Sequence, residues 1–132
     1  LIHWKKNRRI PYKNFKDIPI PIPAIKRLIY APTVDLCKQF EDYLNAHGRK
    51  ALAIWSLNND KQELDWERQS VRNYILENKR SPVNITDLII TSAYAAGIDI
   101  DDPAVNEVIV HTGDNIIRAQ LPGRVRHDME FG

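Results

Sequence analysis

The chain has few of the residues that build disulfide frameworks and metal centres. Its 132 residues include one cysteine, Cys37, which excludes an internal disulfide and a cysteine-based zinc site. The four histidines do not have the spacing of metal ligands: His3, His47, His111 and His127. We therefore expect no metal site and no thiol catalysis. A single thiol also fits a reducing, cytoplasmic compartment.

Long apolar runs and an excess of charge of one sign are absent as well. No stretch approaches the roughly 18 apolar residues needed to cross a bilayer, and the first residues do not have the order of a signal peptide. The 19 basic and 17 acidic side chains nearly cancel, so the net charge of +2 does not by itself indicate a polyanionic partner. We expect one core and no membrane partner.

The motifs of a self-sufficient nucleotide hydrolase are also absent. The sequence has no glycine-rich phosphate loop ending in Lys-Ser or Lys-Thr, and no apolar strand followed by an acidic pair that would hold magnesium. A serine hydrolase triad can be drawn from Ser92, His111 and Asp114, but no nucleophile elbow supports it. The chain by itself is therefore not expected to bind and split a nucleoside triphosphate.

Residues 1–26 differ in composition from the rest of the chain. They contain one basic run and four prolines, namely Lys5, Lys6, Arg8, Arg9, Pro11, Pro19, Pro21 and Pro23. The Ile-Pro repeat over 18–23 excludes a helix and favours extended backbone. We interpret this part as a linker or an edge segment. Its basic run either contacts nucleic-acid phosphates or is a solvated connector.

From residue 27 onward, apolar runs alternate with helical patterns. Residues 27–31 form an apolar run, and Thr33 then has the character of a helix N-cap. Apolar side chains recur at helical spacing over 34–47, and Gly48 stands where a left-handed C-cap residue belongs. A second apolar run at 51–55 predicts the next strand.

The second half of the chain continues this alternation. Asp60 and Glu63 resemble a capping box, and an apolar stripe continues from there to about Asn78. Apolar runs at 87–92 and 105–111 predict two further strands. Strands that are apolar throughout and separated by helices are typical of a parallel sheet covered on both faces. We predict an α/β fold with a mostly parallel central sheet flanked by helices.

Several polar residues are expected at the carboxyl ends of these strands, where ligands bind in open parallel sheets. Thr91 and Ser92 end a strand, and their hydroxyls and amides could bond a phosphate oxygen. Gly97 permits a tight turn, and Asp99 could accept a hydrogen bond from a ribose hydroxyl. Taken singly, each of these residues is also explained by ordinary strand ends and turns.

Three segments together resemble helicase motifs IV, V and VI, in that order. They are residues 27–33, residues 91–100, and the run Gln-Leu-Pro-Gly-Arg-Val-Arg at 120–126. The ordered set resembles the second RecA-like domain of superfamily two helicases, and the match covers residues 27–128. The run Trp-Glu-Arg at 66–68 also resembles the arginine-bearing segment that lies between motifs IV and V. The resemblance implies a RecA-like three-layer fold for residues 27–132.

The resemblance implies a nucleic-acid surface and half of an ATP site. Thr33, Thr91 and Ser92 match positions that contact the backbone of DNA or RNA. Gly97, Asp99 and Gln120 match positions that approach the nucleotide. In motif VI, Arg124 matches the arginine finger that reaches the γ-phosphate, with Arg126 as a second catalytic arginine. ATP and Mg²⁺ would be bound mainly by an N-terminal RecA-like domain, which these residues do not include.

The sequence departs from the usual motifs at a few positions. Ser92 and Ala96 stand where many relatives have an acidic residue and an arginine. The second motif VI arginine normally follows the first by three residues, but Arg126 follows Arg124 by two and His127 occupies the usual place. Either Arg126 substitutes or the second contact is lost.

These observations give one main hypothesis and two alternatives. The main one is the C-terminal motor domain of an ATP-dependent helicase or translocase, part of a longer protein and inactive alone. One alternative is a degenerate helicase-like domain that docks protein or nucleic acid. The other is a stand-alone α/β hydrolase or nucleotide-binding enzyme, which predicts an enclosed pocket with a complete catalytic set.

Overall fold

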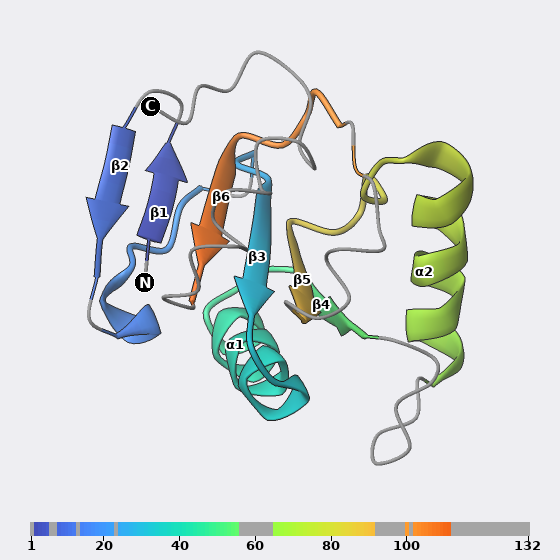
Figure 1. The fold of residues 1–132 in the computed structure, drawn as a ribbon, viewed down its shortest axis with the longest axis horizontal. Helices are drawn as coiled ribbons and strands as arrows, with labels where there is room; N and C mark the ends of the chain where they lie inside the picture. Colours follow the sequence, from blue (N-terminus) through green and yellow to red (C-terminus); the bar gives the residue numbers. More distant parts are fainter. Residues whose placement is uncertain are drawn as a thin grey trace.

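Six strands form one sheet in the order β2-β1-β6-β3-β5-β4, with helices beside it (Figure 1). The computed structural model describes residues 2–5, 8–12, 14–22, 24–55, 65–91, 100 and 102–111. The strands are β1 (Ile2–Lys5), β2 (Arg8–Pro11), β3 (Arg27–Ala31), β4 (Ala51–Ile54), β5 (Asp87–Thr91) and β6 (Glu107–Val110). The helices are α1 (Val34–Ala46), α2 (Trp66–Asn78) and the short 3₁₀ helix η1 (Phe15–Asp17).

Four neighbouring strands of this sheet run parallel. β3 pairs with β5 on one side and β6 on the other, and β4 pairs with β5. β1 pairs with β6 and β2 in antiparallel fashion, so β1 and β2 extend the sheet beyond β6. Every residue of β3, β4, β5 and β6 is buried, as expected for parallel strands covered on both faces. The predicted α/β fold with a mostly parallel sheet is confirmed.

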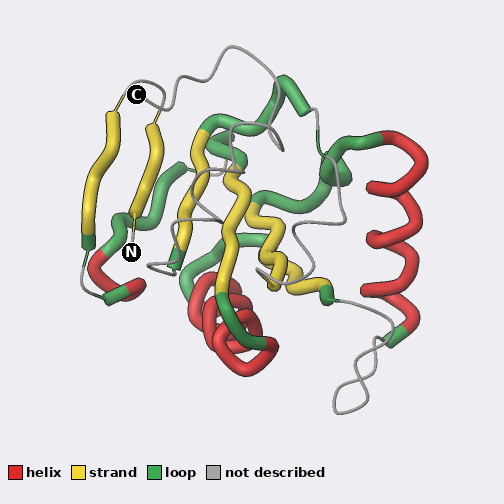
Figure 2. The backbone as a smooth tube through the Cα atoms, viewed as in Figure 1, coloured by secondary structure: helices red, strands yellow, loops and turns green. Residues whose placement is uncertain are grey.

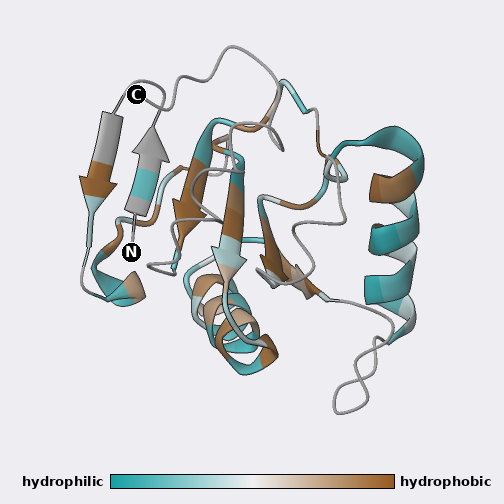
Figure 3. Ribbon diagram, viewed as in Figure 1, coloured by the Kyte–Doolittle hydropathy of each residue, from teal (hydrophilic) through white to brown (hydrophobic). Residues whose placement is uncertain are grey.

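The two helices cover opposite faces of the sheet (Figure 2). Because successive strand residues point to opposite faces, each strand contributes to both cores. The core under α1 contains Ile29, Cys37, Phe40, Leu44, Ala53, Trp55, Ile89 and Ile109. The core under α2 contains Leu28, Tyr30, Leu52, Ile54, Ile75, Leu88, Ile90 and Val108. Figure 3 shows the central strands in hydrophobic colours, whereas α2 is mostly hydrophilic.

Helix α1 begins and ends at the residues that the sequence predicts. The Thr33 hydroxyl accepts a hydrogen bond from the Leu36 amide at 3.1 Å, which satisfies one of the unpaired N–H groups of the first turn. Gly48 has a φ of +86°, a left-handed conformation that side chains disfavour. The chain can therefore reverse directly from α1 into β4.

Helix α2 begins later than the sequence predicts. Its N-cap is Asp65, whose carboxylate accepts a hydrogen bond from the Arg68 amide at 2.9 Å. Asp65 has extended backbone angles, so the helix does not continue from a capping box at Asp60 and Glu63, and the predicted start is wrong. The competing signal was Asp65, an equally good N-cap that lies closer to the buried Ile75. The end of α2 at Asn78 agrees with the sequence.

Candidate functional site

The carboxyl ends of the parallel strands meet at one edge of the sheet. Ala31 is the register partner of Thr91, and Tyr30 is the partner of Val110. The chain therefore leaves β3, β5 and β6 at the same level, which is where ligands bind in open parallel sheets. This edge brings together two of the predicted site residues, Thr33 and Thr91.

Thr33 lies two residues after β3, exposed at the start of α1. Its hydroxyl oxygen accepts the hydrogen bond from the Leu36 amide. A hydroxyl can donate while it accepts, so its hydrogen can still reach a phosphate oxygen. The amino end of a helix also favours negative charge. Thr33 thus has a structural role as the N-cap of α1.

Replacement of Thr33 by alanine tests the structural role. We expect the free energy of unfolding to fall by about 1 kcal/mol, because the alanine variant leaves an amide of the first turn without its partner. Thr33→Ser keeps the hydroxyl and should retain most of this stability. Urea denaturation of both variants gives the comparison, and equal losses for serine and alanine would contradict the cap assignment.

Thr91 is the last residue of β5 and is 6% exposed. It therefore lies at the margin of the core and can present only a small part of its side chain at the edge. The other predicted site residues lie outside the described residues: Ser92, Gly97, Asp99, Gln120, Arg124 and Arg126. The same applies to Ala96, Asp114 and His127.

His111 follows β6 at the same edge. Its amide donates to the Tyr30 carbonyl at 2.8 Å, and its ring lies edge-on to Phe40 with the ring centres 5.8 Å apart. Burial lowers the pKa of this imidazole, so it is neutral at physiological pH. In this position His111 packs against Phe40 in the core under α1. A neutral His111 ring does not supply a positive charge to this edge of the sheet.

A cluster around Trp55 occupies the carboxyl end of β4. Lys38 Nζ lies 5.5 Å from the centre of the Trp55 ring, and the Arg68 guanidinium carbon lies 5.2 Å from it. Arg68 also donates to the Glu41 carboxylate at 2.7 Å. Burial raises the pKa of Glu41, and this effect is opposed by a hydrogen bond from the Ala53 amide and by the charge of Arg68.

This arrangement determines what Arg68 can do. Arg68 belongs to the segment that resembles the arginine-bearing helicase segment, yet its side chain is 13% exposed and is paired with Glu41. It joins α2 to α1 around the end of β4. No sequence pattern predicts this contact, because a cation over an aromatic ring connects residues that are distant in the chain.

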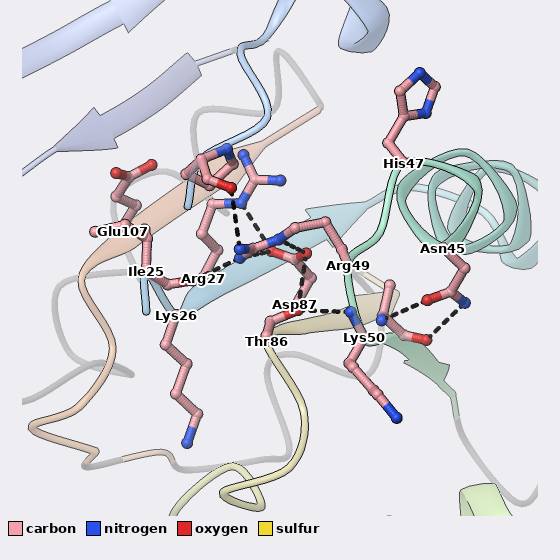
Figure 4. A network of polar contacts seen from close by, with 12 residues as sticks. Ile25, Lys26, Arg27, Asn45, His47, Arg49, Lys50, Thr86, Asp87 and Glu107 are labelled. Atoms are coloured by element: carbon pink, nitrogen blue, oxygen red, sulfur yellow. Dashed lines mark hydrogen bonds and ion pairs between the residues drawn. The ribbon is translucent and has the colours of Figure 1, made fainter. Parts of the chain in front are cut away.

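A second polar cluster lies at the opposite, amino edge of the parallel strands (Figure 4). At its centre is Asp87, which is completely buried. Arg27 Nε donates to one Asp87 oxygen at 2.7 Å, and Arg49 donates to both oxygens, at 2.7 Å from Nε and 3.1 Å from Nη2. One carboxylate thus connects the starts of β3, β4 and β5.

The same arginines hold the proline-rich segment. Arg49 donates to the carbonyl oxygens of Ile22 at 2.9 Å and Ile25 at 2.5 Å. Arg27 lies 3.5 Å from the Pro19 carbonyl. Proline-rich backbone has carbonyl oxygens with few amide partners, so it suits these donors. Because the charges are buried and paired with one another, we interpret this cluster as structural and not as a ligand site.

The sequence pattern alone does not reveal the Asp87 cluster. The available signal was a charged residue at the first position of otherwise apolar strands, which includes Arg27 in β3 and Asp87 in β5. Parallel in-register pairing of those strands makes Arg27 and Asp87 partners. The third member, Arg49, could not be assigned to the cluster without the strand order.

The described residues do not form a group of three or more potential metal ligands. The Cys37 thiol is buried, and burial together with the nearby Glu41 charge raises its pKa to about 12, so it is a poor nucleophile. A cavity of about 10 Å³ is lined by residues of η1, α1, β3 and β6, and it is at the lower limit for one water molecule.

None of the helices among the described residues is long and apolar enough to span a bilayer. Comparisons with protein-family models, with curated proteins and with solved structures found no match to this chain.

Proposed function

We propose that this chain is the C-terminal motor domain of an ATP-dependent nucleic-acid helicase or translocase. The observation that carries the proposal is the pairing of Ala31 with Thr91. It puts Thr91, the first residue of the segment that resembles motif V, beside the last residue of β3, which belongs to the segment that resembles motif IV, so these two parallel strands end at one edge. These motifs serve one function only if they share an edge, and sequence separation alone does not require them to do so.

In this proposal the chain supplies half of an interdomain ATP site. A second RecA-like domain holds ATP and Mg²⁺ with its phosphate loop and acidic pair, and Gly97, Asp99 and Gln120 of this chain approach the nucleotide. Arg124 and Arg126 neutralise charge that develops on the transferred phosphoryl group. Closure and opening of the two domains with nucleotide turnover would move a nucleic-acid strand that is held in part by Thr33, Thr91 and Ser92.

Binding of a single strand tests the surface without the partner domain. We expect Thr91→Val to weaken binding of single-stranded DNA or RNA roughly tenfold, because it removes a hydroxyl that bonds a charged phosphate oxygen and keeps the side-chain shape. Fluorescence anisotropy of labelled oligonucleotides at about 50 and 200 mM salt measures this effect and its salt dependence.

The control for this experiment is Ser70→Ala, which removes an exposed hydroxyl from α2. It should leave binding unchanged. Equal weakening by the two variants, or full affinity of the Thr91→Val protein, would contradict a strand contact at this edge. Comparison of the DNA and RNA oligonucleotides also shows which polymer is preferred.

One observation favours the docking-module alternative as a second candidate. Arg68, the arginine of the segment at 66–68, is paired with Glu41 and lies over the Trp55 ring, so its side chain has a structural role that does not require a nucleotide or a strand. A docking module would retain nucleic-acid binding, but replacement of its motif VI arginines would not change ATP turnover by the full protein. The Arg124 experiment described below therefore separates the two proposals.

A further inference from the structure

The sheet has two terminal strands, β2 and β4, and their sequences differ in charge. β2 contains Arg8, Arg9 and Pro11, and charged residues and proline discourage pairing with another strand. β4 reads Ala-Leu-Ala-Ile, followed by Trp55, and has neither charge nor proline. An uncharged apolar edge strand of this kind is prone to pair with another chain unless something covers it.

Helix α1 covers the outer edge of β4 with a side-chain amide. Asn45 Oδ1 accepts the Ala51 N–H at 2.8 Å, and Asn45 Nδ2 donates to the Ala51 carbonyl at 3.0 Å (Figure 4). The carboxamide thus offers the same donor and acceptor that a residue of a neighbouring strand would offer. The backbone N–H and C=O groups of Ala51 are therefore both hydrogen-bonded, as they would be beside another strand.

A second side chain of α1 repeats this arrangement one turn earlier. Glu41 Oε2 accepts the Ala53 N–H at 2.6 Å. Four helical residues rise about 6 Å, and two strand residues rise about 6.6 Å, so Glu41 and Asn45 match the spacing of Ala53 and Ala51. The four-residue spacing of Glu41 and Asn45 on α1 therefore matches the two-residue spacing of Ala53 and Ala51 on β4.

Arg68 fixes the second of these contacts from the other face of the sheet. It donates to Glu41 Oε1 at 2.7 Å, while Glu41 Oε2 accepts from Ala53. Since α1 and α2 cover opposite faces, this ion pair passes around the edge of β4. A strand that approached this edge would have to displace Asn45 and the Glu41–Arg68 pair together.

We propose that Asn45 and Glu41 are a strand mimic that keeps a self-association edge closed, and that the edge fits β4 of a second copy of this chain. Two copies of β4 can pair antiparallel about a two-fold axis, because they bring no like charges into opposition. β2 does not share this property, since its sequence contains two arginines. This inference does not depend on the proposed function.

The test is the double variant Asn45→Ala, Glu41→Ala of this chain. We expect a monomer–dimer equilibrium that shifts toward dimer with concentration in sedimentation velocity, whereas the parent chain stays monomeric. At low concentration the Ala51 and Ala53 amides should exchange with deuterium roughly tenfold faster than in the parent. At high concentration their protection should return, because the second copy replaces the side-chain partners.

The matched control is Gln39→Ala, Asp42→Ala, which alters two exposed residues of the same helix and should remain monomeric. If circular dichroism shows that the double variant is unfolded, the same two measurements are made on Asn45→Ala alone, which retains the Glu41–Arg68 pair. A folded variant that stays monomeric at all concentrations overturns the proposal. Association that leaves the Ala51 and Ala53 amides unprotected overturns it as well.

Discussion

Arg124→Ala is expected to lower ATP hydrolysis at least about a thousandfold in a protein that joins this chain to its phosphate-loop domain. ATP affinity should change little. An arginine finger stabilises the charge that develops in the transition state, and it contributes less to the ground state, where the phosphate loop and Mg²⁺ hold the nucleotide. The effect should therefore appear in kcat and not in the Kd for ATP.

Steady-state hydrolysis and equilibrium binding of a fluorescent ATP analogue measure the two quantities separately. Arg80→Ala is the control, because Arg80 is an exposed arginine in the loop that follows α2. The chain without a partner domain should show no turnover. Unchanged hydrolysis by the Arg124→Ala protein would refute the finger assignment and favour the docking module, and turnover by the chain alone would refute the motor proposal.

The motif VI departure gives this experiment a second arm. Arg126 and His127 are the two candidates for the second contact, because Arg126 follows Arg124 by two residues and the usual place, three residues after Arg124, is occupied by His127. Alanine at whichever of Arg126 and His127 contacts the nucleotide should lower kcat. Alanine at the other position should have little effect on kcat.

The alternation of strands and helices could be predicted because it depends on local patterns. The apolar runs at 27–31 and 51–55, the Thr33 cap and the Gly48 reversal each reflect residues within one turn or one strand. The start of α2 could not be chosen reliably, since Asp60 and Asp65 both have the chemistry of an N-cap. Strand order was also inaccessible, because it depends on pairings between distant residues.

The residues of the candidate site also include some that could be predicted from local sequence patterns and some that could not. Thr33 and Thr91 could be assigned to strand ends from the sequence, and the register then places them at one edge. The hydrogen bonds and ion pairs of Arg68, Glu41 and Asn45 could not be predicted from the sequence. Each joins elements that no sequence pattern connects, and each depends on which strand lies at the edge of the sheet.

Asp87→Asn should lower the free energy of unfolding by about 3–5 kcal/mol. Asparagine has nearly the shape of aspartate but no charge, so the Arg27 and Arg49 side chains, 1% and 2% exposed, would lose the carboxylate that pairs with both of them while remaining buried. Removal of one member of a buried ionic group costs more than the group itself contributes, because the remaining charges are not solvated. The loss is a large fraction of the stability of a typical domain, roughly 5–15 kcal/mol.

Urea denaturation of Asp87→Asn and of the exposed control Asp42→Asn gives the comparison, and a loss below about 1 kcal/mol would contradict the central role of Asp87. A double-mutant cycle with Arg27→Met isolates the pair. The Arg27→Met, Asp87→Asn protein should lose less than the sum of the single variants, because removal of one guanidinium reduces the uncompensated charge. Arg49 should continue to hold the Ile22 and Ile25 carbonyls, so the start of β4 and the proline-rich segment should stay together even when the link to β3 is broken.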